Sequence, residues 1–213
     1  MYINKKFLDF MFSGKMHYEG QTESHFIVNE PQGVLVITKG RLVLADPYAI
    51  NYGVVLSEDI PNGKFPVSVF TAHLEPHDEV KVAGFLVRFD ESDEAVPNEW
   101  RMCLPSEVNE ADIPDDGYYG VSTESGNVCI CAEQTVGWLL EHLDESGEVL
   151  ADIEKQISAT YFANGGVANA KLPGIEVNVF AMVGGSPETA YPAYWGYKDG
   201  KVVCLAIDFL VVD

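Results

Sequence analysis

Short apolar segments recur along the chain between turn residues, and several alternate apolar and polar positions with the period of a half-buried β-strand. Turn signals at Lys39-Gly40 and at residues 124–126 predict tight turns that join neighbouring strands. Pro66 predicts that its strand lies at a sheet edge or begins there, because proline donates no ladder hydrogen bond. The segments typical of strands are 25–28, 34–38, 41–45, 65–72, 80–89, 100–104, 118–121, 127–131, 174–183 and the two halves of 191–212.

The segment 191–212 predicts a β-hairpin at the end of the chain. Its turn is Lys198-Asp199-Gly200-Lys201, and Asp-Gly between two apolar runs is typical of a type I′ turn. The second strand of this hairpin is apolar almost throughout and carries one carboxylate, Asp208, well inside it.

Helical spacing of apolar residues occurs in only two regions. Residues 2–12 predict a short amphipathic helix that ends at Gly14. Residues 133–163 predict the longest helical region, which Gly147 divides and which Asn164-Gly165-Gly166 ends. The order of strands, then helices, then strands predicts an α+β fold with a predominantly antiparallel, sandwich-like β-sheet and two or three helices.

The 213 residues suffice for a substantial core, and no linker clearly divides them. We expect residues 1–32 to form an N-terminal helix and loop extension, and residues 33–213 to form a single mainly-β domain. No run approaches the length of a membrane-spanning helix, and the apolar segment 7–12 is too short for a secretory signal and carries Asp9.

Acidic residues dominate the charge of the chain. It has 33 Asp and Glu against 13 Lys and Arg, a formal net charge of −20. Residues 90–116 are especially acidic and contain one basic residue, Arg101, so we expect them to form a surface excursion. This charge disfavours nucleic acids and anionic membranes as partners and permits a basic protein or divalent cations. Solubility alone is the simpler explanation of the same charge.

The four cysteines are too few for a disulfide scaffold in a chain of this length. We therefore expect reduced thiols and a cytoplasmic location. Cys129 and Cys131 lie on one face of a predicted strand, but a single C-x-C is a weak zinc signal, and buried free thiols are the ordinary interpretation. The other two cysteines are Cys103 and Cys204.

Four blocks of sequence occur in a fixed order: GRLVLADP at 40–47, PNGKFPV at 61–67, YGV at 119–121 and the terminal segment 191–211. Together they resemble the bacterial domain-of-unknown-function family 4241 over roughly residues 33–212. That family has no established activity, so the resemblance implies neither a reaction nor a cofactor. Its members often carry Asp after Tyr-Gly-Val, whereas this chain has Ser122, so the resemblance implies no acidic group there.

Two carboxylates are the candidate catalytic residues. Asp46 ends a predicted strand before Pro47, where functional sites are commonly built, although Asp before Pro also caps its own turn. Asp208 is flanked by Ile207 and Phe209, so alternation places it on the opposite face of its strand. If the two carboxyls meet, they can supply an acid and a base or bind a metal. The structural alternative is that Asp208 is solvated or paired with Arg41 or Arg88.

The densest aromatic cluster of the chain lies in the terminal hairpin. Aromatic side chains with polar tips suit both interfaces and sheet packing, and the sequence leaves these two roles open. The candidate residues for contact with a ligand or partner are Arg41, His73, Tyr191, Tyr194, Trp195 and Tyr197.

No sequence motif indicates a reaction, so the first hypothesis is a non-enzymatic, acidic, cytoplasmic interaction protein, for example an antitoxin-like one, that binds a basic protein partner. One alternative is a hydrolase-like or metal-assisted enzyme that uses Asp46 and Asp208. Another is a small-ligand-binding protein that uses the aromatic hairpin. We expect no cofactor, no nucleic acid and no membrane partner, and the sequence leaves the oligomeric state open.

Overall fold

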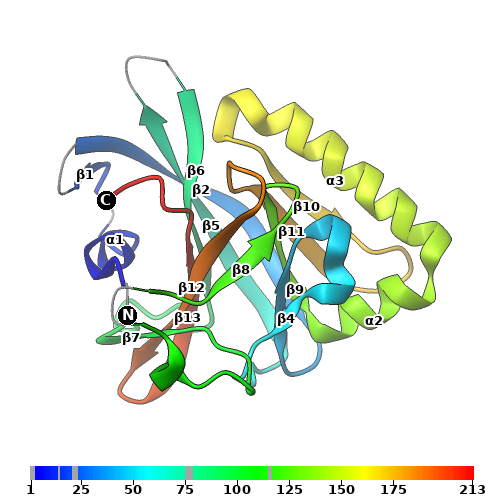
Figure 1. Ribbon diagram of the computed structural model, residues 1–213, viewed down its shortest axis with the longest axis horizontal. Helices are drawn as coiled ribbons and strands as arrows, with labels where there is room; N and C mark the ends of the chain where they lie inside the picture. Colours follow the sequence, from blue (N-terminus) through cyan, green and yellow to red (C-terminus); the bar gives the residue numbers. More distant parts are fainter. Residues whose placement is uncertain (1–2, 14, 21–23, 75–78, 115–116) are drawn as a thin grey trace.

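Two antiparallel β-sheets packed face to face form the body of this computed structural model, which describes residues 3–13, 15–20, 24–74, 79–114 and 117–213 (Figure 1). The larger sheet has the order β1 (His17–Glu19), β2 (Ser24–Ile37), β5 (Gly63–Leu74), β6 (Glu79–Arg88), β13 (Lys201–Asp208), β12 (Thr189–Lys198) and β7 (Glu99–Met102), and β8 (Gly120–Thr123) also pairs with β12. The smaller sheet has the order β10 (Val167–Lys171), β11 (Asn178–Val183), β9 (Asn127–Ala132), β3 (Leu42–Ala45) and β4 (Val54–Val55).

Helices cover the outer faces of both sheets. The short helix α1 (Lys5–Phe10) lies on the larger sheet, whereas α2 (Glu133–Glu141) and α3 (Leu143–Asn164) lie on the opposite side of the molecule, against the smaller sheet (Figure 1). Two 3₁₀ helices, η1 (Pro47–Tyr52) and η2 (Glu110–Asp112), lie in loops. This arrangement confirms the predicted α+β class with mostly antiparallel, sandwich-like sheets. None of the helices within the described residues is long and apolar enough to cross a membrane.

Three apolar cores lie between the layers of the fold. An inner core between the two sheets includes Phe85, Phe180 and Leu205. A second core, which we call the cap core, lies between α1 and the outer face of the larger sheet and includes Phe7 and Ala206. A third core lies between the smaller sheet and the helices α2 and α3. Because side chains alternate along each strand, one strand of the larger sheet contributes to both the inner core and the cap core.

The predicted terminal hairpin is confirmed. Strands β12 and β13 pair antiparallel from Ala193↔Ile207 to Lys198↔Lys201. Asp199 and Gly200 have positive φ of 50° and 79°, as both central residues of a type I′ turn require. The predicted helical region is also confirmed, and α3 ends at Asn164, before Gly165, whose φ of 76° is left-handed. The expected division at Gly147 was wrong, because the break between α2 and α3 lies at His142 and Gly147 lies inside α3. Gly14, the expected end of the first helix, lies outside the described residues.

The two other turns predicted to join hairpins instead carry the chain from one sheet to the other. Strand β2 pairs with β1 and β5, whereas β3 pairs with β4 and β9 in the smaller sheet. Likewise, β8 pairs with β12, whereas β9 pairs with β11 and β3. The expectation of two hairpins was wrong because strand pairing depends on distant segments, which a turn signal does not reveal.

Strand β2 joins two segments that the sequence pattern separates. It runs from Ser24 to Ile37 and pairs with β5 on both sides of an irregularity between Pro31 and Gly33. The expected boundary between residues 32 and 33 therefore lies inside this strand. Pro66 lies neither on an edge strand nor at the start of its strand, the two positions expected for it, because β5 begins at Gly63 and lies between β2 and β6. It lies opposite Val34 of β2, just beyond the start of the β6 ladder at Val67.

Candidate functional site

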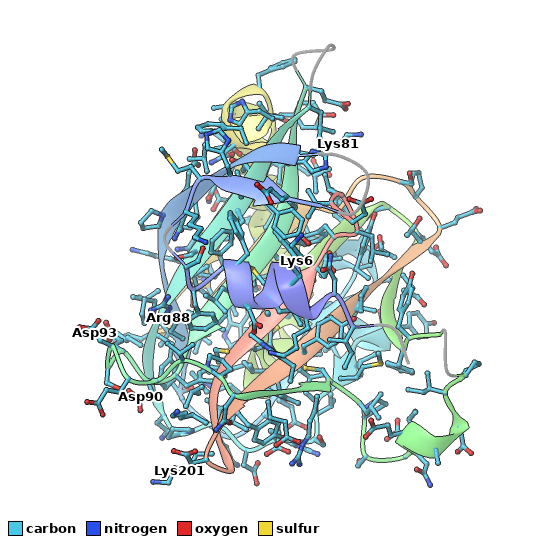
Figure 2. All side chains as sticks on the ribbon, turned by 90° about the vertical axis from the view of Figure 1, so that its left-hand side faces the viewer. Lys6, Lys81, Arg88, Asp90, Asp93 and Lys201 are labelled. Atoms are coloured by element: carbon cyan, nitrogen blue, oxygen red, sulfur yellow. The ribbon has the colours of Figure 1, made fainter. Side chains whose placement is uncertain are left out.

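An acidic cleft opens where the tip of the β12–β13 hairpin meets two loops. Its volume is about 580 Å³, and its walls come from the segment before β5, the loop after β6 and the hairpin tip. Figure 2 shows Asp90 in the loop after β6 and Lys201 at the hairpin tip, on the same side of the molecule. The charged residues that line the cleft are Glu58, Asp59, Asp90, Glu94, Asp199, Lys198 and Lys201.

The hairpin tip is fastened to the loop that precedes β7. The amide nitrogen of Asn98 donates to the carbonyl of Tyr197 over 2.9 Å, and its side-chain Nδ2 donates to Oδ1 of Asp199 over 3.0 Å. The type I′ turn therefore holds its carboxylate at a defined position on the rim of the cleft.

Tyr197 forms part of the wall and links three elements. Its hydroxyl donates to Oε1 of Glu58 over 2.9 Å, and the guanidinium of Arg101 lies 4.5 Å from the centre of its ring. Burial raises the pKa of Tyr197, and the hydrogen bond to the Glu58 carboxylate raises it further. The phenol is thus a neutral donor at physiological pH, and it keeps the Glu58 carboxylate in place.

The charge of the cleft suits a cationic group. Five carboxylates and two lysines line it. The backbone amide of Ser92 donates to Asp90 over 2.9 Å and lowers the pKa of that carboxyl. A flexible basic side chain can enter a cleft of this size and meet several carboxylates at once. In the described part of the chain, the cleft included, no cluster of three or more His, Cys, Asp or Glu side chains is arranged to hold a metal ion.

Asp46 has a structural set of partners at the point where β8 passes into β9. Its Oδ1 accepts from the amide of Tyr48 over 2.9 Å. Its Oδ2 accepts from the Thr123 hydroxyl over 3.2 Å and from the amides of Glu124 and Ser125 over 3.0 and 2.8 Å. Burial acts to raise the pKa of Asp46, but these hydrogen bonds outweigh it and the pKa is lowered. The carboxylate therefore fixes a chain crossing between the sheets.

Asp208 lies elsewhere, on the outer face of the larger sheet. Ile207 and Phe209 belong to the inner core, so Asp208 lies on the opposite face of the strand, as predicted. That face carries Ala206 and belongs to the cap core. Its side chain is fully buried, its Oδ1 accepts from the amide of Leu210 over 2.8 Å, and its Oδ2 has no hydrogen-bond partner. Asp46 and Asp208 thus have separate partners, and neither lines the acidic cleft.

The two basic candidates, Arg41 and His73, contact residues other than Asp46 and Asp208. Arg41 forms a two-pronged ion pair with Glu133 in the first turn of α2, with distances of 2.8 and 3.1 Å. The ring of His73 packs edge-on against Phe26 at 5.5 Å between centroids. The Arg88 guanidinium lies 4.5 Å from the centre of the Phe12 ring. The alternative in which Arg41 pairs with Asp208 is therefore wrong.

The aromatic cluster serves mainly as core. Tyr191 and Trp195 belong to the inner core and Tyr194 belongs to the cap core, with at most 3% of any of these side chains exposed. Tyr197 is the member that also lines the acidic cleft. The four cysteines are buried and free, and burial raises the pKa of Cys131 and Cys204 to about 12. Such thiols are unreactive at physiological pH.

Sequence reasoning missed most of the cleft. It recognised Asp199 only as a turn residue, and it recognised Asp90 and Glu94 only as part of an acidic excursion. It did not single out Glu58 or Asp59, which precede the turn signal at 61–63. The available signal was the presence of acidic residues beside three separate turns, but which turns meet depends on the strand order.

Comparison with known proteins identifies the family. The DUF4241 family, described as proteins of unknown function, matches residues 35–207. The chain belongs to this family. No curated protein and no solved structure matches the chain. The DUF4241 match spans the smaller sheet, α2, α3 and most strands of the larger sheet, and it leaves α1, β1, β2 before Leu35 and the residues after Ile207 outside.

Proposed function

We propose that this protein is a non-enzymatic interaction protein whose acidic cleft binds a basic segment of a partner protein. The observation that carries the proposal is the cleft at the tip of the β12–β13 hairpin, with five carboxylates and two lysines around about 580 Å³. A lysine or arginine side chain in this cleft can form charge-assisted hydrogen bonds with several carboxylates at once, which single carboxylates on the exposed surface do not offer.

The overall charge supports the same proposal. A net charge of −20 accelerates encounter with a positively charged partner, and carboxylates fixed in a cleft then select the basic segment that fits. We place the protein in the bacterial cytoplasm in this proposal, where an antitoxin-like role would consist of covering the basic functional surface of another protein.

The enzyme alternative draws less support from the geometry. It requires Asp46 and Asp208 in one pocket, whereas Asp46 is saturated by four hydrogen bonds and Asp208 faces the cap core. The small-ligand alternative requires exposed aromatic surface, whereas all four of its aromatic residues are buried in the cores.

The test compares two triple variants of equal charge with an arginine-rich peptide as the probe. The cleft variant is Asp59→Asn, Glu94→Gln and Asp199→Asn, in which asparagine preserves the turn. The matched control is Glu141→Gln, Glu148→Gln and Glu176→Gln, at exposed positions on α2, on α3 and before β11. We expect the cleft variant to weaken binding by about tenfold and the control by less than about twofold, with affinity falling as salt rises. Equal losses in the two variants would show that net charge alone attracts the peptide, and the proposal would then fail.

A further inference from the structure

The two ends of the chain pack together on the outer face of the larger sheet. We call α1 and β1 together, with Asn4, the N-terminal cap. Figure 2 shows α1 crossing in front of the larger sheet, with Lys6 on it. Phe7 and Leu8 of the cap are fully buried. Both the cap and the C-terminal residues after Ile207 lie outside the residues that match the family.

Polar contacts join the cap to the C-terminal residues. The side-chain Nδ2 of Asn4 donates to the carbonyl of Val212 over 3.2 Å. The Tyr18 hydroxyl lies 2.9 Å from the carbonyl of Asp213 and 3.2 Å from Oδ1 of Asn4. The position of the cap therefore depends on the path of the chain after β13.

The cap lies directly over Asp208. Asp208 pairs with Gly84 of β6, and residues paired across an antiparallel ladder direct their side chains to the same face. A Cβ atom at Gly84 would lie 2.9 Å from Sδ of Met11 and 3.0 Å from the Phe7 ring. The end of α1 thus rests on the backbone beside Asp208, and glycine makes this approach possible.

The Asp208 carboxyl group also shapes the chain that holds the cap. Its Oδ1 accepts from the amide of Leu210, whose φ of 57° is left-handed and unusual for leucine. Its Oδ2 is buried and has no partner. A carboxylate in this position lacks the donors that a buried charge needs, whereas the neutral acid carries a much smaller desolvation cost.

No basic side chain in the described residues forms an ion pair with Asp208. The Lys6 ammonium lies 5.6 Å from the centre of the Tyr18 ring, and Asp9 accepts from Lys5 and from Nε1 of Trp100. Burial raises the pKa of Asp208 to about 7, and the hydrogen bond from Leu210 offsets part of this rise. The titratable and charged groups on the elements around it include Lys6 and Asp9 on α1, Tyr18 on β1, His25 on β2, Lys81 and Arg88 on β6, Tyr194 on β12 and Asp213.

We propose that Asp208 makes docking of the N-terminal cap sensitive to pH, because the neutral carboxyl stabilises the docked cap and ionisation favours its release. When the cap lifts, water reaches Oδ2 and the carboxylate regains its hydration. Opening of the cap is therefore coupled to loss of a proton from Asp208. The docked state binds this proton more tightly than the open state, so opening becomes easier as pH rises toward neutrality.

Hydrogen exchange of the backbone amides in residues 5–19 measures this coupling, after correction for the intrinsic pH dependence of exchange. In the unmodified protein we expect protection to fall by up to about tenfold per pH unit from about pH 4.5 to about pH 7, and then to level off. In Asp208→Asn, where no proton is lost, the corrected protection should be independent of pH over this range. The matched control Asp93→Asn, an exposed acid, should behave like the unmodified protein.

A second variant keeps the proposal testable if Asp208→Asn does not fold. Tyr18→Phe removes a contact between the cap and Asp213 without touching the carboxyl group. It should lower protection by a similar factor at every pH and retain the slope. Protection of the cap that is independent of pH in the unmodified protein would overturn the proposal. The same pH dependence in Asp208→Asn, which would assign it to His25 or another group, would also overturn it.

Discussion

Asp46 and Asp208 are both buried carboxylates near the ends of strands, but their hydrogen-bond partners differ and their pKa values shift in opposite directions. Four donors surround Asp46, three of them on its Oδ2 atom, and the pKa of the group is lowered. One donor reaches Asp208, its Oδ2 atom has none, and burial raises its pKa to about 7. Burial raises the pKa at both sites but is deeper at Asp208, so the depth of burial and the number of hydrogen-bond donors together decide which protonation state is favoured.

The difference assigns the two carboxylates opposite effects on stability. Asp46 stabilises the fold when it is ionised, and it loses this effect as pH falls through its lowered pKa. Asp208 is tolerated best when it is neutral. Its unfavourable contribution grows as pH rises from the ordinary value for aspartate to about 7. Each of the following predictions tests one side of this contrast.

The largest effect is expected from Asp46→Ala. The substitution leaves the amides of Tyr48, Glu124 and Ser125 and the Thr123 hydroxyl without their acceptor. We expect a loss of about 4 kcal/mol in the free energy of unfolding at pH 7, because charge-assisted hydrogen bonds and orphaned donors are both costly. Urea denaturation measures this loss, with the exposed Asp93→Ala as the control. A loss below about 1 kcal/mol would contradict a structural role for Asp46.

Asp208→Asn should act in the opposite direction. At pH 8 we expect the free energy of unfolding of the variant to exceed that of the unmodified protein by about 3 kcal/mol. Asparagine avoids burying a charge, and its side-chain oxygen can still accept from the amide of Leu210. Near pH 4 the two proteins should differ by less than about 1 kcal/mol. Urea denaturation at both pH values measures the difference. An equal change in the free energy of unfolding at pH 8 and near pH 4 would show that ionisation of Asp208 is not its cause.

The acidic limb of the stability curve separates the two groups further. Protonation of Asp46 below about pH 4 should reduce stability, because the neutral acid accepts fewer strong hydrogen bonds. Below about pH 4 Asp208 should contribute nothing to this limb, because its carboxyl is largely neutral there in both the folded and the unfolded chain. We therefore expect Asp208→Asn to keep the acidic loss of stability and Asp46→Asn to reduce it, as measured by thermal unfolding between about pH 2 and about pH 4.

The smallest effect is expected from Thr123→Val. Valine has nearly the same shape and removes one of the four donors to Asp46, together with the acceptor for the amide of Gly126. We expect a loss of about 1–2 kcal/mol at pH 7. In the Asp46→Ala background the same change should cost less, because the bond to Asp46 is already absent, and a double-mutant cycle measures that coupling. Strict additivity would show that the hydroxyl does not support Asp46.

The sequence by itself determined the local elements of this protein. Asp199-Gly200 predicted the hairpin turn because a type I′ turn requires positive φ at both positions, and the structure has it. Apolar spacing predicted α2 and α3, and Gly165 ends α3 as a left-handed residue. Each of these features depends on residues close together in the chain, so a local pattern is sufficient to find it.

For Asp46 and Asp208, local rules predicted one feature of each residue but not its tertiary contacts. The turn bond from Asp46 to the amide of Tyr48 and the outward face of Asp208 both follow from local rules, and the structure confirms them. Only the tertiary structure brought Thr123 and Ser125 to Asp46, and only the tertiary structure placed α1 over Asp208. It likewise decided which acidic turns meet in the cleft. These outcomes depend on contacts between segments far apart in the chain, and the free energy of such contacts is set by how the sheets pair and pack.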